Sequence, residues 1–260
     1  VGAINGASFD EPDNRCAIIA YDYTVFAGTQ GARNHRKTDR MIQLAERARM
    51  PVVLFAEGGG GRPGDTEGNG GATHTFASFP RLSGLVPVVG ITAGRCFAGN
   101  ASLLGCCDVI IATADSNIGM GGPAMIEGGG LGVFAPEDIG PAHIQARNGV
   151  IDLLVSDEAE AVATARRYLS FFQGRLRDWT APDQRRMRRI VPENRLRAYN
   201  VRDVIDTIAD EGSVLELRRD FGSGMVTVLA RIEEEQGGRL DVLANNAFQV
   251  TDGNSSLLRA

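Results

Sequence analysis

Three glycine-rich segments mark the places in this sequence where backbone amides can do chemistry. They read EGGGG at 57–61, AGNA at 98–101 and GMGGP at 119–123. Glycine leaves the backbone N–H uncovered, and the first N–H groups of a helix have no partner within that helix. Two such groups aimed at one point form an oxyanion hole. Because a short helix is predicted over Ala101–Cys106, we expect Gly99 and Asn100 to donate such a pair; the alternative is that these turns only let strand ends pack closely.

Conventional catalytic side chains are scarce. The three histidines, His35, His74 and His143, share no metal-ligand spacing, so the sequence predicts no metal site. Ser102 could form a hydrolytic triad with His143 or His74, but the GxSxG elbow is absent. The glycine turns match neither GxGxxG nor the P-loop pattern. Many backbone donors beside few acids or bases favour a site that stabilises an enolate or a thioester oxyanion, while another group handles the proton.

Short β-branched runs alternate with amphipathic stretches through roughly the first two thirds of the chain. The runs are continuous and apolar, as in strands covered on both faces: Cys16–Tyr21, Val52–Ala56, Val86–Thr92 and Val109–Thr113. Helices are predicted over Asn34–Arg49 and Ala159–Phe172, where apolar residues recur at spacings of three and four. This alternation is typical of a layered α/β domain.

The composition changes after residue 174. Residues 174–197 hold eight arginines and three acidic residues, and they are interpreted either as a solvated linker or as a cationic surface for phosphates or a partner subunit. Beyond them a helix is predicted over Asn200–Gly212, with strands over Val214–Leu217 and Met225–Ile232. This last unit is so short that its stability as an independently folding domain would be marginal.

Composition excludes several classes of protein. The 260 residues carry a formal net charge of −5, which argues against a general nucleic-acid binder. No apolar run reaches the roughly 18 residues of a membrane span, and no signal peptide is visible at the start. The four cysteines form no CxxC pair and are expected to be reduced core thiols of a cytoplasmic protein.

Several longer segments contain motifs that, taken together, are typical of one family. Residues 87–170 contain the AGRCFAGNA turn, then DVII, GMGGP, PEDIG and GVID; residues 57–65 read EGGGGRPGD; and residues 190–232 contain VPENRLRAYNVRDVID followed by FG. Together they resemble the carboxyltransferase component of biotin-dependent acyl-CoA carboxylases, a family of the crotonase superfamily. The resemblance covers roughly residues 1–235.

The resemblance implies an α/β fold of the crotonase-like (ClpP-type) ββα superhelix. It implies an N-terminal carboxyltransferase domain at 1–174, an arginine-rich linker at 175–198, and the truncated start of a second domain at 199–260. In this family the first half of one subunit faces the second half of another, so at least a dimer is expected. Acyl-CoA and carboxybiotin meet there, with biotin on a partner: the biotin carboxylase and biotin carboxyl carrier components. CO2 then passes to the α-carbon through an enolate.

Residue roles follow from the same resemblance. Gly99 and Asn100 match the backbone oxyanion pair, where two glycines are more usual. Four further glycines match turns that line the acyl-CoA pocket, and two cations fall where CoA phosphates are expected: Gly59, Gly60, Gly121, Gly122, Lys37 and Arg40.

Other interpretations stay open. One is a different crotonase-fold acyl-CoA enzyme (hydratase, isomerase, decarboxylase or hydrolase), of which a hydratase would be favoured by an acidic residue beside the oxyanion pair. Another is a non-catalytic assembly subunit, which would fit the truncated second half. Residues 236–249 also resemble the NNAG strand of short-chain dehydrogenases, but the TGxxxGxG and YxxxK patterns of that family are absent.

Overall fold

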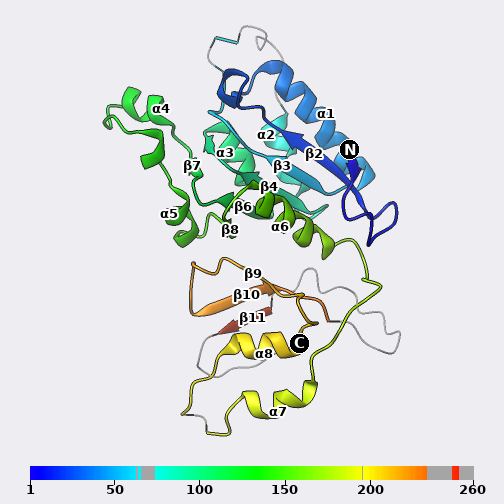
Figure 1. Ribbon diagram of the computed structural model, residues 1–260. Coiled ribbons are helices and arrows are strands. Elements are labelled where there is room, and N and C mark those ends of the chain that lie inside the picture. Colours follow the sequence, from blue (N-terminus) through cyan, green and yellow to red (C-terminus); the bar gives the residue numbers. More distant parts are fainter. Residues whose placement is uncertain (63, 66–73, 195, 233–247, 252–260) are drawn as a thin grey trace.

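A largely parallel sheet forms the centre of the N-terminal part of the chain (Figure 1). The computed structural model describes residues 1–62, 64–65, 74–194, 196–232 and 248–251. The sheet has the order β1-β2-β3-β4-β6-β8, and only β1 pairs antiparallel. Its strands are β1 (Gly2–Ala3), β2 (Arg15–Ala20), β3 (Val52–Phe55), β4 (Val88–Thr92), β6 (Val109–Thr113) and β8 (Leu153–Val155).

Alternate side chains of these strands enter two separate cores. Val52 and Leu54 of β3 face one core, whereas Val53 faces the other. Both β4 and β6 are buried at every position. Because successive side chains of a strand point to opposite faces, a sheet covered on both sides needs apolar residues throughout. That requirement explains the continuous apolar runs of the sequence.

Helices and a second sheet cover the two faces. The first core receives residues of α1 (Ala32–Ala48), of α3 (Gly99–Leu104) and of the turn η3 (Pro80–Leu82), which follows α2 (Thr75–Ser78). The second core receives one side of α6 (Glu158–Ser170) together with Leu215 and Leu229. Residues from beyond the arginine-rich segment therefore pack directly against the N-terminal sheet.

A second, two-stranded sheet lies beside the first and was not predicted. It pairs β5 (Arg95–Phe97) with β7 (Asn117–Gly119) in parallel, and Gly58 adds a bridge to Cys96. An arm then extends away from the body (Figure 1). The arm contains α4 (Pro123–Gly128), η4 (Pro136–Asp138) and α5 (Ala142–Arg147).

The C-terminal part is a small antiparallel sheet with short helices. Its strand order is β11-β10-β9. The elements are η5 (Gln184–Arg186), α7 (Met187–Ile190), α8 (Val201–Ile208), β9 (Leu215–Leu217), β10 (Met225–Leu229) and β11 (Phe248–Thr251). Among the described helices, none combines the length and the apolar character that crossing a bilayer requires.

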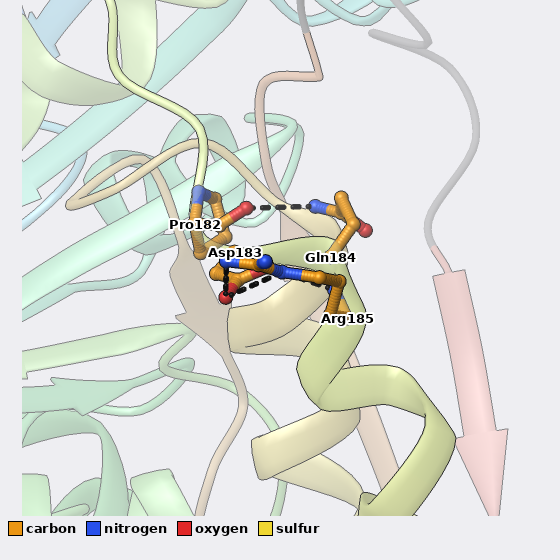
Figure 2. Close-up of polar contacts among 4 residues, drawn as sticks. All are labelled: Pro182, Asp183, Gln184 and Arg185. Carbon is orange, nitrogen blue, oxygen red and sulfur yellow. Dashed lines mark hydrogen bonds and ion pairs between the residues drawn. The ribbon is translucent and has the colours of Figure 1, made fainter.

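The arginine-rich segment is folded rather than extended. Arg185 forms an ion pair with Asp183, and the side-chain amide of Gln184 donates to the Pro182 carbonyl at 3.4 Å (Figure 2). The same amide donates to the carbonyl of Thr207 in α8 at 2.7 Å. This contact ties the segment to the helix that follows it in the chain.

The α/β class and the main strands are confirmed, with corrections at the ends. The last predicted helix ends at Ile208, not Gly212, because Ala209 already has extended backbone angles (φ −78°, ψ 152°). The strand predicted to reach Ile232 ends at Leu229. Most of the 236–249 segment lies outside the described residues. The domain boundaries at 174 and 198 stay predictions.

Candidate active site at the converging glycine turns

The β5–β7 sheet brings the three glycine turns together. The Phe97 amide donates to the Gly58 carbonyl at 2.9 Å, and the Ala98 amide donates to the Gly119 carbonyl at 3.1 Å. Strand β5 therefore lies between the first turn and the third. Helix α3 begins where β5 ends, so the second turn sits at the same junction.

Gly60 of the first turn lies against the amide of Gly99. A Cβ added at Gly60 would fall 2.5 Å from the Ala98 Cβ and 2.8 Å from the Gly99 nitrogen. Gly60 also has φ +84°, in the region that side chains disfavour. No side chain fits at this position.

The other predicted pocket glycines are less constrained. A Cβ on Gly122 would lie 3.6 Å from the Phe97 ring, which is ordinary contact and places the third turn beside β5. At Gly59 and Gly121 the nearest atoms, on Thr29 and Ile126, would also be 3.6 Å away. The structure thus brings these glycines near the junction, but only Gly60 is excluded from carrying a side chain.

Helix α3 begins two residues earlier than predicted. Its first internal hydrogen bond runs from the Ser102 amide to the Ala98 carbonyl at 2.8 Å, so Gly99 and Asn100 are its first two residues. Helix geometry leaves their amides without an internal partner. Within the described part of the chain no acceptor binds either amide. Two unpaired donors therefore lie at the convergence of the turns.

Asn100 fits this position without backbone strain. It is absent from the residues with positive φ, so the substitution of asparagine for glycine keeps both the helix and the N–H. Its side chain is fully buried, and Nδ2 donates to the carbonyls of Gly28 (3.1 Å) and Glu57. Its Oδ1 has no partner among the residues that the structure describes. From the sequence Asn100 was expected to act only as a backbone donor, and these side-chain contacts were not predicted.

Gln30 and Phe76 close over Gly99. The backbone N–H of Gln30 donates to the Gly60 carbonyl at 2.6 Å. The side chain of Gln30 is buried, and its Nε2 donates to Tyr21 Oη at 3.2 Å. A Cβ on Gly99 would fall 2.5 Å from Gln30 Oε1 and 3.2 Å from Phe76 Cζ. Neither residue was singled out from the sequence, because a lone glutamine in a loop carries no pattern.

Glu57 is a half-buried carboxylate at the first turn. Its Oε1 accepts from the Ala93 amide at 2.6 Å and from Thr92 Oγ1 at 3.4 Å. Desolvation by burial raises the pKa of this carboxyl, and the hydrogen bonds oppose the rise. The carboxylate is therefore engaged at the turn between β4 and β5. An acid directly after a buried strand was the signal that would have identified it.

Lys37 and Arg40 lie on the exposed side of α1. They stand roughly 8 and 12 Å along the helix from Ala32, at 1.5 Å per residue. No described contact joins either of them to the glycine turns. Their role at CoA phosphates stays a prediction.

The hydrolytic triad finds no support. Ser102 Oγ donates to the Ala98 carbonyl at 3.1 Å and contacts Met120 Sδ at 3.8 Å. No contact among the described residues joins Ser102 to His74 or His143. The described residues also contain no cluster of three or more metal-ligating side chains.

The change Ser102→Ala tests this conclusion. We expect the variant to keep acyl-CoA turnover within about twofold, because the hydroxyl donates to the Ala98 carbonyl at the start of its own helix and its other described contact is with Met120 Sδ. The measurement is kcat/KM of the wild type and the variant under the same conditions. A folded but inactive variant would restore the hydrolase interpretation.

The six-stranded sheet, the separate β5–β7 pair and the unpaired amides define a class: the fold is the crotonase-like fold of acyl-CoA carboxyltransferases. The chain belongs to the family of the carboxyl transferase domain, whose model matches residues 2–258.

Individual relatives agree with this assignment. A single-chain, multi-domain long-chain acyl-CoA carboxylase superposes with a TM-score of 0.84 at 60% identity, over 88% of this chain and 23% of that one. The transcarboxylase 12S structure, a hexamer with methylmalonyl-CoA bound, gives a TM-score of 0.71 at 27% identity, over 82% of this chain and 44% of that one.

Among curated proteins, the methylmalonyl-CoA carboxyltransferase 12S subunit of Propionibacterium freudenreichii subsp. shermanii is 30% identical over 234 residues, 86% of this chain and 44% of that protein. The chain thus spans about half the length of the curated relatives it matches.

Proposed function

We propose that this chain supplies the acyl-CoA side of a biotin-dependent carboxyltransferase. One observation carries the proposal: the Gly99 and Asn100 amides have no partner among the described residues, at a junction packed so closely that a Cβ on Gly60 would clash with Ala98 and a Cβ on Gly99 would clash with Gln30. The pair donates to the thioester oxygen of acyl-CoA. The donation strengthens as that oxygen gains negative charge in the enolate, so the rate of enolate formation rises.

The proton is handled outside this chain's side chains. Glu57 is occupied by the Ala93 amide, and Ser102 by its own helix. Biotin, carried by a partner component, supplies the carboxyl group and the base for the α-proton. The residues described here hold the thioester, orient its α-carbon and stabilise the enolate oxygen. The Gly59 and Gly121–Gly122 segments line the same pocket.

Partners and assembly are part of the proposal. The arm after β7 carries large apolar side chains that are exposed in the single chain: Met120, Met125, Leu131, Val133 and Phe134. Several large apolar side chains exposed on one short segment point to a protein interface. We propose that it contacts the second carboxyltransferase half of another subunit, giving at least a dimer that works with biotin carboxylase and carrier components. The four free thiols favour a cytoplasmic setting.

Calorimetry with an acyl-CoA tests the proposal. We expect the chain to bind acyl-CoA and, when supplied with a second carboxyltransferase half, to exchange carboxyl between malonyl-CoA and free biotin. Absence of both CoA binding and exchange would contradict the function. Binding without exchange would favour a non-catalytic assembly role.

The same titration tests the two cations. The double change Lys37→Ala with Arg40→Ala is expected to weaken acyl-CoA binding about five- to tenfold, because exposed charge pairs contribute little each. Arg47→Ala on the same helix is the matched control, since Arg47 donates to the Gln43 carbonyl of its own helix. Equal affinities of the wild type and the double variant would remove the predicted phosphate role.

A further inference from the structure

We propose that Asn100 is a positioning residue. Its side-chain amide holds together three chain segments around the candidate active site, namely those of Gly28, Glu57 and Asn100 itself. The inference rests on the proposed function, since the atoms it positions are the amides of Gly99 and Asn100. It concerns the side chain and is separate from the backbone donation.

Asn100 joins two segments that lie far from it in the sequence. Nδ2 donates to the Gly28 carbonyl, 72 residues away, and to the Glu57 carbonyl, 43 residues away. Those two segments are already packed backbone against backbone: a Cβ on Gly28 would fall 2.6 Å from the Glu57 oxygen. Outside helices and strands, no other described donor reaches either carbonyl. The amide therefore ties the start of α3 to this packed pair.

The chemistry of the contact allows one orientation. Both partners are carbonyl oxygens, so the nitrogen of the amide must face them and Oδ1 must point away. With both hydrogens used, the side chain cannot rotate without breaking two bonds. Because Asn100 is the second residue of α3, this fixes the direction of the first two amides of the helix relative to Gly60.

The unpaired Oδ1 lowers the contribution of the Asn100 side chain to the stability of the fold. A buried acceptor without a partner is unfavourable, and it offsets part of what the two donations contribute. What the amide supplies is a fixed geometry at the junction.

Asn14 offers a matched control in the same chain. It is also buried, its Nδ2 donates to the Phe9 carbonyl at 3.0 Å, and its Oδ1 likewise has no partner in the described part of the chain. Its contacts lie in the N-terminal loop and involve none of the glycine turns. Replacing either asparagine by aspartate keeps the shape of the side chain and turns a donor into an acceptor facing a carbonyl.

Amide hydrogen exchange of the full chain is the first test, and it needs no substrate. Asn100→Asp is expected to speed exchange about tenfold or more in peptides covering 26–30, 57–61 and 98–104, because the tie between them opens locally. Asn14→Asp is expected to change only peptides near residues 4–15. If the aspartate variant does not fold, Asn100→Ala replaces it, since it removes both donations and the unpaired oxygen. It is expected to speed exchange in the same three peptides. Unchanged exchange in these peptides overturns the inference.

Kinetics with the second carboxyltransferase half present is the further test. Asn100→Asp is expected to lower kcat about 10²-fold, because displaced donors lose transition-state stabilisation, while KM for acyl-CoA changes less than about threefold. Asn14→Asp is expected to leave both constants near the wild type. A rise in KM alone, or equal losses in the two variants, overturns the positioning role. If the wild type neither binds acyl-CoA nor exchanges carboxyl, the proposed function fails, and the hydrogen-exchange result still decides the role of the amide.

Discussion

Gly60→Ala is expected to lower carboxyl transfer about 10²-fold or more. The added Cβ would meet the Ala98 Cβ at 2.5 Å and the Gly99 nitrogen at 2.8 Å, so either the first turn or the start of α3 must move. The backbone angle adds a local cost of about 1–2 kcal/mol, because φ is +84°. The measurement is kcat for carboxyl exchange together with the midpoint of thermal unfolding.

Gly61→Ala is the matched control for this prediction. No heavy atom of the described residues lies within 4 Å of a Cβ placed there, and the residue has no left-handed φ. We expect activity and unfolding midpoint close to the wild type. If the two variants behave alike, the packing of Gly60 against Gly99 does not matter for turnover.

Gly99→Val is expected to lower turnover about 10²–10³-fold, the loss typical of removing one oxyanion donor. Its Cβ would fall 2.5 Å from Gln30 Oε1, and Gln30 is held in the core by Tyr21 and Gly60. The same Cβ would lie 3.2 Å from Phe76 Cζ, so the start of α3 must move to accommodate the branched side chain. Steady-state kinetics, with circular dichroism to confirm the fold, gives the measurement.

Gly224→Val serves as the comparison, because a Cβ there meets no atom of a described residue within 4 Å and the residue lies just before β10. We expect it to leave turnover unchanged. A folded Gly99→Val protein with wild-type turnover would show that the Gly99 amide does not donate to the reacting oxygen, and the proposed function would lose its main support.

Much of the fold follows from local pattern. The runs at Val52 and Val109 become strands as predicted, because a strand buried on both faces requires uninterrupted apolar residues. The helix after Asn34 follows from apolar spacing, although it begins at Ala32. Strand β5 was missed because three residues are too few for a periodic signal, and its pairing with Asn117 is decided by contacts distant in the sequence.

The sequence by itself determined an α/β chain with glycine turns after its strands, and it identified Gly60 and Gly99 as candidates, because composition and spacing are local properties. Only the tertiary structure decided that these turns meet at the β5–α3 junction. It also revealed that Gln30 closes over Gly99 and that the Asn100 amide bonds Gly28 and Glu57. These contacts join residues dozens of positions apart, and their geometry depends on how the two sheets pack, which no local pattern encodes.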